Sequence, residues 1–331
     1  MVLVTGGTGL VGAHLLLHLV DNGVSVRAIY RNEKTIQRTK TLFSLYKKEL
    51  LFEKIDWIIA DILDVPTLEI AFENVEYVYH CAAIISFDPK DEGLLRKTNI
   101  EGTANIVNFC ISNSVKKLCF ISSISALGDL KNNEKTITEE TEWNPEKPHS
   151  DYAISKYGAE MEVWRGHQEG LNVIIVNPGV ILGPTIWQEG SGKIFTQIQQ
   201  GLSFYTKGIT GFVAVNDVVK ILIQLMNSNI NNERFTLVAE NIVYRDLLNS
   251  IANALKMKRP TIYASPILMG FLWKIDWFVS TFFRQKRKLS RAAAKASYSK
   301  NLYSNAKISN ALGITFLDIN QNIKEIAKFV S

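Results

Sequence analysis

The stretch VLVTGGTGLVG, Val2–Gly12, decides the fold of this chain. Its first residues are apolar and rich in valine, which predicts a buried strand over 2–6 that runs into a glycine. From residue 10 the apolar residues recur with helical spacing, and this pattern predicts an amphipathic helix over 10–23 that ends at Gly23. The chain therefore opens with a strand, a glycine-rich turn and a helix in direct succession.

Glycines recur every three residues in this turn, at Gly6, Gly9 and Gly12. The first permits a tight turn, the second lets the backbone approach a pyrophosphate, and the third lets the helix pack close to the strand. The helix N-terminus offers N–H groups and the positive end of its dipole to a phosphate. The context predicts a dinucleotide site, with a tight turn that binds nothing as the alternative. The loop residues assigned to this site are Gly6, Thr8, Gly9, Leu10, Val11 and Gly12.

Strand-like and helix-like segments alternate along the first half of the chain. The strand-like segments are rich in Val and Ile without polar alternation, as expected when helices cover both faces of a sheet. This order predicts an α/β fold over 1–183, a Rossmann-type doubly wound parallel sheet that binds the dinucleotide. We expect a smaller, mixed substrate-binding lobe over 184–331, with segments such as 211–222 returning to the first domain. The predicted strands are 24–31, 56–61, 75–83, 116–123 and 172–183, and the predicted helices are 65–73, 91–113 and one that contains Tyr152.

The 331 residues have an ordinary globular composition, 47% hydrophobic and 21% charged. The net charge of +5, from 37 basic and 32 acidic residues, is too diffuse to indicate nucleic-acid binding. Cys81, Cys110 and Cys119 lie in apolar runs without metal-ligand spacing. We therefore expect buried thiols, no metal site and a reduced, cytoplasmic protein without a signal peptide.

The end of the second predicted strand bears on the choice of cofactor. An acidic residue at this point would bind the ribose 2′-hydroxyl of NAD. This chain has Tyr30 followed by Arg31, with Lys34 and Arg38 beyond. A guanidinium fits a 2′-phosphate and stacks on adenine, so the sequence favours NADP over NAD. The alternative is that Arg31 is a solvated loop charge.

A second motif, SDYAISKYGAEM at Ser150–Met161, places Tyr152 and Lys156 one helical turn apart. A tyrosine exchanges a proton with a carbonyl or an alcohol if its pKa of about 10 is lowered, and a nearby ammonium favours the phenolate. Ser122 and Ser123 end an earlier predicted strand, and ligands of open α/β sheets bind beyond such strand ends. The pattern predicts a Ser–Tyr–Lys site, with a surface helix pair as the alternative for the tyrosine and the lysine.

Together these motifs resemble an extended short-chain dehydrogenase/reductase of the NAD-dependent epimerase/dehydratase superfamily. Further matching segments are HCAA at 80–83, TNIEGTAN at 98–105, FISSISALG at 120–128, NPGVILGP at 177–184, GFVAVNDVVKIL at 211–222 and YSNAKISNALGI at 303–314. The resemblance covers nearly the whole chain. Tyr30–Arg31 and NPGVILGP are most similar to the dihydroflavonol 4-reductase-like branch.

The resemblance implies a role for each matching position. Ser123 would hold the reacting oxygen, and Tyr152 would donate the proton in reduction and accept it in oxidation. Lys156 would lower the pKa of Tyr152 and bind the nicotinamide ribose. Asn99 is placed with the catalytic set in support of the active-site helix, with a turn cap as the alternative. The other cofactor contacts are Tyr30, Arg31, Asp61, Ile62, Ala82, Ala83, Pro178 and Val180.

Aromatic residues are frequent in the segments that would line a substrate pocket, among them Phe87 and Trp187, and no arginine cluster suits a nucleotide diphosphate. This favours an apolar or aromatic substrate, with core packing of these aromatics as the alternative. The apolar segment 262–283 is interrupted by charges, which argues against a membrane-spanning helix. We expect a lid or core helix, with peripheral contact of 262–288 with an anionic membrane surface as the alternative.

The combined pattern predicts an NADP(H)-dependent oxidoreductase that reduces a ketone or an aldehyde. One alternative is an NAD-dependent sugar-nucleotide epimerase or dehydratase, against which the absence of an acidic residue at positions 30 and 31 argues. The other is a non-catalytic dinucleotide sensor, which has no need of Ser123, Tyr152 and Lys156 together. The family also implies a homodimer through the helices near 91–113 and 151–169.

Overall fold

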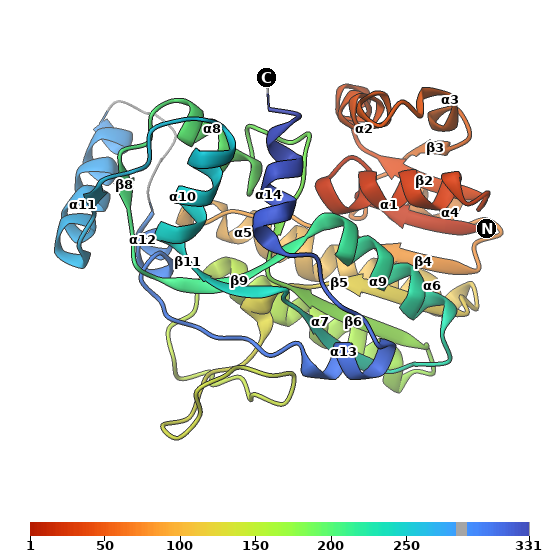
Figure 1. Cartoon of the computed structure of the whole chain (residues 1–331). Helices are drawn as coiled ribbons and strands as arrows, with labels where there is room; N and C mark the ends of the chain where they lie inside the picture. Colours follow the sequence, from red (N-terminus) through yellow and green to blue (C-terminus); the bar gives the residue numbers. More distant parts are fainter. Residues whose placement is uncertain (283–289, 331) are drawn as a thin grey trace.

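The large sheet of this protein has seven strands. The structure, a computed structural model, describes residues 1–282 and 290–330 (Figure 1). The strands are β1 (Val2–Thr5), β2 (Val26–Tyr30), β3 (Asp56–Ile59), β4 (Tyr77–His80), β5 (Lys117–Ile121), β6 (Val173–Pro178) and β10 (Glu233–Leu237). They lie in the order β10-β6-β5-β4-β1-β2-β3, and all neighbours are parallel. The order reverses between β1 and β4, where ligands of doubly wound sheets bind. The predicted Rossmann-type fold is confirmed.

Helices connect the strands of this sheet. They are α1 (Leu10–Asp21), α2 (Glu33–Leu45), α3 (Glu49–Phe52), α4 (Val65–Ala71), α5 (Glu92–Leu95), α6 (Gly102–Ser112), α7 (Asp151–Gln168) and α9 (Val215–Asn227). The helix predicted over 91–113 is interrupted: a 3₁₀ turn (Pro89–Asp91) precedes α5, and a π-helical segment, η2 (Arg96–Glu101), joins α5 to α6. π-Helical turns are frequent at functional sites, and η2 contains Asn99.

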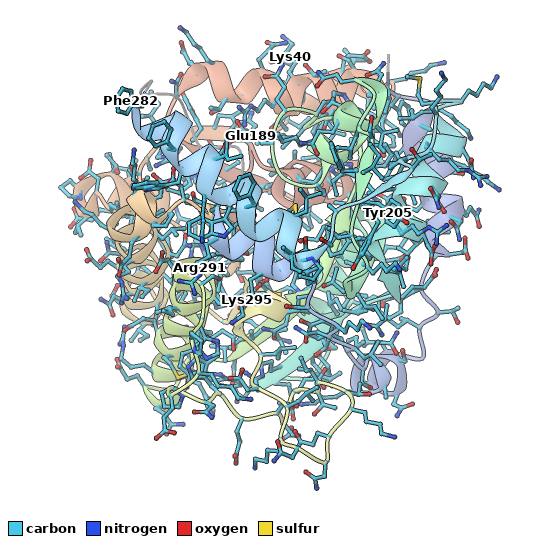
Figure 2. All side chains as sticks on the ribbon, turned by 90° about the vertical axis from the view of Figure 1, so that its left-hand side faces the viewer. Lys40, Glu189, Tyr205, Phe282, Arg291 and Lys295 are labelled. Carbon is cyan, nitrogen blue, oxygen red and sulfur yellow. The ribbon has the colours of Figure 1, made fainter. Side chains whose placement is uncertain are left out.

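The second half of the chain builds a mixed lobe. Its strands are β7 (Val180–Leu182), β9 (Ile209–Ala214) and β11 (Glu240–Val243), in the order β11-β9-β7, and the separate pair β8 (Phe204–Tyr205) and β12 (Ile262–Tyr263). Its helices are α8 (Gly192–Gln199), α10 (Tyr244–Ala254), α11 (Pro266–Phe282), α12 (Arg291–Ala296), α13 (Ala306–Leu312) and α14 (Ile319–Ala327). Figures 1 and 2 show α11 at the edge of this lobe. Within the described ranges, no helix combines the length and the apolar character that a bilayer crossing needs.

The single strand predicted over 172–183 is wrong, because β6 and β7 belong to different sheets. The chain leaves the large sheet at Gly179, where a Cβ atom would lie 2.5 Å from the carbonyl oxygen of Gly211. It later returns, since β10 completes the large sheet beyond residue 183. The segment 211–222 is divided, with β9 in the small sheet and α9 packed on α1. The division into 1–183 and 184–331 stays a prediction.

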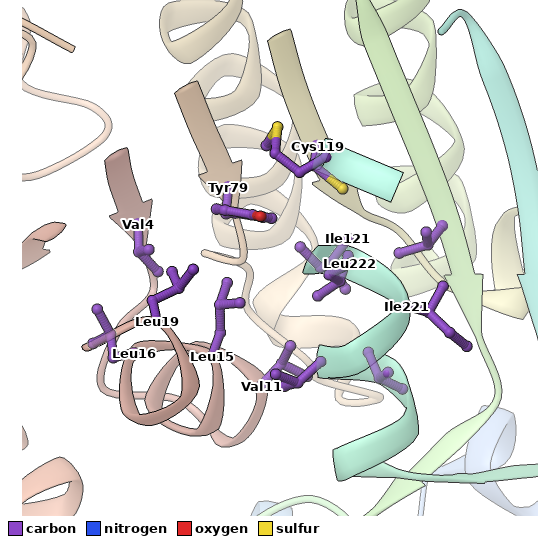
Figure 3. Close-up of a cluster of buried hydrophobic side chains, with 14 of the residues drawn as sticks. Val4, Val11, Leu15, Leu16, Leu19, Tyr79, Cys119, Ile121, Ile221 and Leu222 are labelled. Carbon is purple, nitrogen blue, oxygen red and sulfur yellow. The ribbon is translucent and has the colours of Figure 1, made fainter. Parts of the chain in front are cut away.

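Two apolar clusters cover the two faces of the large sheet. On one face Leu15 of α1 and Leu222 of α9 pack against Val4, Tyr79 and other strand residues (Figure 3). On the opposite face the neighbouring strand residues pack against α4, α6 and α7. Successive side chains of one strand point to opposite faces. Burial of both faces therefore explains why these strands are apolar at consecutive positions.

Candidate active site

The carboxyl ends of the parallel strands gather the residues that the sequence predicts for the site. Gly6 follows β1, Ala82 follows β4 and Ser123 follows β5. Tyr152 and Lys156 lie in the first two turns of α7, and both are buried. In a parallel sheet all these strand ends lie at one edge, so the fold brings the separate motifs together there.

The glycine loop is too tight for side chains. Gly6 has a φ of +68°, and a Cβ there would lie 2.6 Å from the amide nitrogen of Ala82. A Cβ on Gly12 would lie 2.2 Å from the carbonyl oxygen of Gly6. Gly9 is the N-cap of α1 and offers no side-chain cap to its first N–H groups. These features fit a dinucleotide, whose pyrophosphate would accept hydrogen bonds from the helix N-terminus.

The side chains of Tyr152 and Ser123 are neighbours, close enough for the serine to act on the pKa of the phenol. Their residues are only 8% and 9% exposed. Burial raises the pKa of the Tyr152 phenol above its usual value, and the polar Ser123 side chain opposes this shift. Ser123 Oγ also accepts a hydrogen bond from the amide of Ser125, 3.1 Å away. The geometry therefore offers a protonated phenol beside an oriented hydroxyl at the end of β5.

Lys156 is turned toward the same strand end. Its Nζ donates a 2.9 Å hydrogen bond to the carbonyl oxygen of Ile121 and lies 4.3 Å from the centre of the Phe120 ring. Burial lowers the pKa of Lys156 to about 8, and the Glu160 carboxylate opposes this shift. The expected lowering of the Tyr152 pKa by Lys156 is not seen in this geometry. Burial and Ser123 set that pKa, while the ammonium is held by β5.

Asn99 links the loop after β4 to α7. Its amide exchanges two hydrogen bonds with the backbone of Ile84, at 2.8 and 3.0 Å, and Nδ2 also donates to Ser155 Oγ at 2.9 Å. Ser155 lies between Tyr152 and Lys156 in sequence and is completely buried. All three bonds join Asn99 to other parts of the protein. In this geometry Asn99 therefore positions α7, the helix that carries Tyr152.

The residues predicted at the adenosine end come together at β2 and β3. Arg31 follows β2, and its Nη1 lies 3.8 Å from Asp61 Oδ2, beyond the end of β3. The arginine side chain is 59% exposed, so water screens this pair. Tyr30 packs edge-on against Trp57, with ring centres 6.0 Å apart. Ile62 is buried against Gly102, where a Cβ would lie 2.5 Å from the isoleucine side chain.

The remaining predicted contacts line the rest of this edge. Ala82 donates its amide to Thr5 Oγ1 at 3.2 Å, and Ala83 next to it is exposed. Pro178 at the end of β6 is buried, and Val180 in β7 is half-buried. These residues lie at or just beyond the carboxyl ends of β4 and β6.

His80 lies between two threonine side chains, and the three cysteines form no disulfide. His80 bonds to Thr5 Oγ1 at 2.7 Å through one ring nitrogen and to Thr103 Oγ1 at 3.0 Å through the other. Burial lowers the pKa of His80 to about 3, which keeps the ring neutral. The three cysteines are free thiols, and Cys110 and Cys119 are buried. No cluster of His, Cys, Asp or Glu in the described part of the chain could hold a metal ion.

A buried ionic network behind the site was missed at the sequence level. Glu160, completely buried, accepts hydrogen bonds from Asn177 Nδ2 at 2.5 Å and from Arg234 Nη1 at 3.1 Å. Asn177 Nδ2 also donates to the carbonyl oxygen of Ser123 at 2.9 Å. The network thus connects the serine to α7, β6 and β10. Glu160 follows Lys156 by four residues, as Lys156 follows Tyr152. This spacing could have indicated that Glu160 lies on the same side of the helix as the other two residues.

The aromatic side chains that the sequence suggests for a substrate pocket lie in different places. The ring of Phe87 lies 5.8 Å from that of Tyr152 and is 40% exposed, whereas Phe195 is completely buried in the core of the second lobe. A cavity of about 600 Å³ is lined by Trp187 and by residues of α8. Neither Ser123 nor Tyr152 lines that cavity. Of these aromatics, Phe87 is the one that contacts the predicted catalytic tyrosine.

Comparison with known proteins gives the same family. The model of the NAD dependent epimerase/dehydratase family matches residues 2–237. A protein of Synechocystis sp. named for dihydroflavonol 4-reductase is 30% identical over 217 residues, which are 65% of this chain and 60% of that relative. Sterol demethylase protein B of Methylococcus capsulatus is 28% identical over 269 residues, 81% of this chain and 78% of the relative. The crystal structure of UDP-glucose 4-epimerase from Thermotoga maritima has a TM-score of 0.77 at 20% identity, over 99% of this chain and 97% of that one.

Proposed function

Because the chain belongs to the NAD dependent epimerase/dehydratase family and is an NAD(P)-dependent oxidoreductase, we propose that it reduces a ketone or an aldehyde with NADPH. The observation that carries this proposal is the burial of Tyr152 and Ser123 as neighbours at the carboxyl end of β5, where the serine acts on the pKa of the phenol. A phenol and a second hydroxyl side by side suit the oxygen of a carbonyl group. They would bind it from two directions.

Each residue has a defined task in this reaction. The nicotinamide, when bound, supplies a hydride to the carbonyl carbon. Ser123 donates a hydrogen bond to the carbonyl oxygen, and Tyr152 transfers its proton to that oxygen as the C–O double bond becomes a single bond. Burial raises the pKa of Tyr152, so the phenol is protonated at neutral pH, as an acid must be. Lys156, whose ammonium is held by the carbonyl oxygen of Ile121 in this structure, would bind the nicotinamide ribose.

The preference for NADP rests on Arg31. It follows β2, at the position where NAD-dependent relatives of this fold carry an acidic residue for the ribose 2′-hydroxyl. Its exposed guanidinium is free to turn from Asp61 toward a 2′-phosphate, to which arginine binds in a bidentate manner. Asp61, next to it, would then face the adenosine from the end of β3.

The substrate we propose is an apolar or aromatic carbonyl compound. Phe87 lies beside Tyr152 and is partly exposed, so it offers a ring face or edge to a substrate that reaches the phenol. The names of the two relatives refer to a dihydroflavonol, which has aromatic rings, and to a sterol, which has an apolar ring system. Aryl and polycyclic ketones and aldehydes are therefore the panel to test first.

The reaction mechanism is tested by Tyr152→Phe, with Tyr157→Phe on the same helix as the matched control. Tyr157 stacks on Trp143 with ring centres 4.4 Å apart and has no place in the proposed reaction. We expect Tyr152→Phe to lower kcat by at least about 100-fold while NADPH binding is kept. Unchanged turnover in Tyr152→Phe would exclude the proposed proton donor.

The cofactor preference is tested by titrating the purified protein with NADPH and with NADH, followed by fluorescence. We expect Arg31→Ala to weaken NADPH binding by at least about tenfold, because it removes the charge-assisted hydrogen bonds to the 2′-phosphate, and to leave NADH binding unchanged. Lys54→Ala, at an exposed site before β3 and at the opposite end of that strand from Asp61, is the control. Preference of the wild-type protein for NADH, or NAD that co-purifies with it, would contradict the proposal and favour the sugar-nucleotide epimerase alternative.

A further inference from the structure

An apolar surface lies on α11, at the edge of the second lobe. Ile267, Phe271, Ile275, Phe278 and Phe282 are spaced by three or four residues, so they lie on one side of the helix. All five are exposed, Ile267 at 87% and Phe282 at 74%. Large apolar groups that gather on one surface mark an interaction site.

The two-stranded sheet before α11 extends this surface. Phe204 of β8 and Ile262 of β12 are 44% and 47% exposed. Tyr298, beyond α12, donates hydrogen bonds to the carbonyl oxygens of Ala264 and Ser265, at 3.2 and 3.0 Å. These bonds hold the beginning of α11 against the lobe. In Figure 2 α11 crosses the front of the molecule, with Phe282 near its far end.

Positive charge accompanies this surface. By sequence, residues 255–300 carry 11 basic residues and one acidic residue, whereas the other 285 residues carry 26 basic and 31 acidic residues. The basic run 284–288 is part of that count but lies outside the described residues. Seven described cations of this stretch are exposed: Lys256, Lys258, Arg259, Lys274, Arg291, Lys295 and Lys300. Figure 2 shows Arg291 and Lys295 beside α11.

We infer that this surface docks on an anionic lipid bilayer, with α11 lying in the interface and the surrounding cations on the phosphate headgroups. A helix with one apolar side and a basic surround binds such an interface through two additive contributions, apolar burial and electrostatic attraction. A lid over an apolar pocket would bury the same rings but has no use for the cations. A second copy of this chain would bring two positive surfaces together, which is unfavourable. The inference is independent of the reaction proposed above.

Vesicle flotation with the full chain tests this inference. Vesicles of phosphatidylcholine alone are compared with vesicles of equal parts phosphatidylcholine and phosphatidylglycerol. We expect at least about tenfold stronger binding to the anionic vesicles, lost on raising the salt from about 0.1 to 1 M because the Debye length falls from about 10 to 3 Å. Brominated lipid chains should quench the fluorescence of Trp273 and Trp277 on α11, and Trp277→Phe should reduce the quenching.

Two double variants separate the apolar and the electrostatic contributions. Phe271→Ser with Phe278→Ser removes rings, and Lys274→Gln with Lys295→Gln removes charges; each should weaken binding at least about tenfold. Leu50→Ser with Lys54→Gln is the matched control, since Leu50 is 86% exposed on α3, at the opposite side of the molecule from α11 (Figure 1). The control should bind as the wild-type protein does. The charge variant changes only exposed side chains, so we expect it to fold. It therefore still tests the inference if the phenylalanine variant does not fold.

Several outcomes would overturn the inference. They are no binding to anionic vesicles, equal binding to neutral vesicles, and binding that neither double variant weakens. Self-association without lipid that the phenylalanine variant abolishes, with no vesicle binding, would identify a second copy as the occupant. A raised KM in that variant without vesicle binding would identify a lid.

Discussion

Single residues of the site are governed by burial. Lys156 is 1% exposed, and its pKa is lowered to about 8. Burial also raises the pKa of Tyr152 and lowers that of His80, so the same cause acts on three groups at one edge of the sheet. Desolvation disfavours the charged form of each group. The protonation states of the site therefore follow from where the fold places these side chains.

We predict that Lys156 makes the protein more stable as the pH rises from about 8 toward 10.5. The folded-state pKa lies below the ordinary value of 10.5, so in this window the unfolded chain binds more protons and the free energy of unfolding increases with pH. The neutral Lys156→Met should exceed the wild-type protein in stability below pH 8, by about 3 kcal/mol at most, and lose this lead near pH 10.5. Urea unfolding of both proteins across this range measures the effect. A lead that does not change with pH would contradict the prediction, and Lys54→Met is the exposed control.

A methyl group at Gly12 should disable the dinucleotide loop. Its Cβ would lie 2.2 Å from the carbonyl oxygen of Gly6, so the loop or α1 must move. We expect Gly12→Ala to weaken NADPH binding by at least about tenfold, since the pyrophosphate site depends on this close packing. In Gly93→Ala, the control on α5, no atom lies within 4 Å of the new Cβ. Equal cofactor affinity of Gly12→Ala and the wild-type protein would show that the loop tolerates the shift.

At the scale of secondary-structure elements, α7 is held from both sides. Asn99 on η2 ties its first turn to the loop after β4, through Ser155 and Ile84. On its other side Glu160 joins Asn177 of β6 and Arg234 of β10. The helix that carries Tyr152 and Lys156 is thus connected to three other elements by buried polar groups. Asn177 Oδ1 is buried without a hydrogen-bond partner, so the network is not fully satisfied, but the bonds that it forms tie α7 to β6 and β10.

Removing the cation of this network should leave a buried charge without its partner. We expect Arg234→Met to lower the free energy of unfolding by about 3 kcal/mol, because the Glu160 carboxylate is completely buried. Adding Glu160→Gln should restore part of that loss, since the amide keeps the bond from Asn177 and carries no charge. Urea unfolding of the two single variants and the double variant gives the coupling. Strictly additive losses would mean that the pair does not interact.

The whole molecule combines two sheets that the chain enters more than once. β6 and β7 are adjacent in sequence yet lie in different sheets, and β10 returns to the large sheet. The positive charge is concentrated in residues 255–300, which contain α11 and α12. The dinucleotide loop and the proposed membrane surface therefore lie on different parts of the molecule (Figure 1).

We propose that two chains associate through α5, α6 and α7, as the family resemblance implies. Leu94 on α5 and Met161 on α7 are 49% and 39% exposed, which offers apolar groups to a partner. Light scattering should give twice the chain mass of 37.2 kDa, and Leu94→Glu with Met161→Glu should give the single mass. Leu50→Glu is the control. A single mass for the wild-type protein would contradict the dimer.

The sequence by itself determined the Rossmann fold and the glycine loop, and it proposed the members of the site. These features depend on neighbours in the chain: Gly6, Gly9 and Gly12 lie within one turn, and Tyr152 and Lys156 are one helical turn apart. The apolar runs also identified most strands, because helices cover both faces of the sheet. The site could be predicted to this extent because strand ends of a parallel sheet meet at one edge.

Only the tertiary structure decided how these groups act on one another. Three contacts of the site join residues that are far apart in the chain. They are the ion pair of Arg31 with Asp61, the hydrogen bond from Lys156 to the carbonyl oxygen of Ile121, and the network of Glu160, Asn177 and Arg234. The division of one apolar run into β6 and β7 likewise depends on the close approach of a distant strand at Gly179. Local pattern carries no information on such contacts, because burial, hydrogen-bond partners and pKa shifts arise only when distant segments pack together.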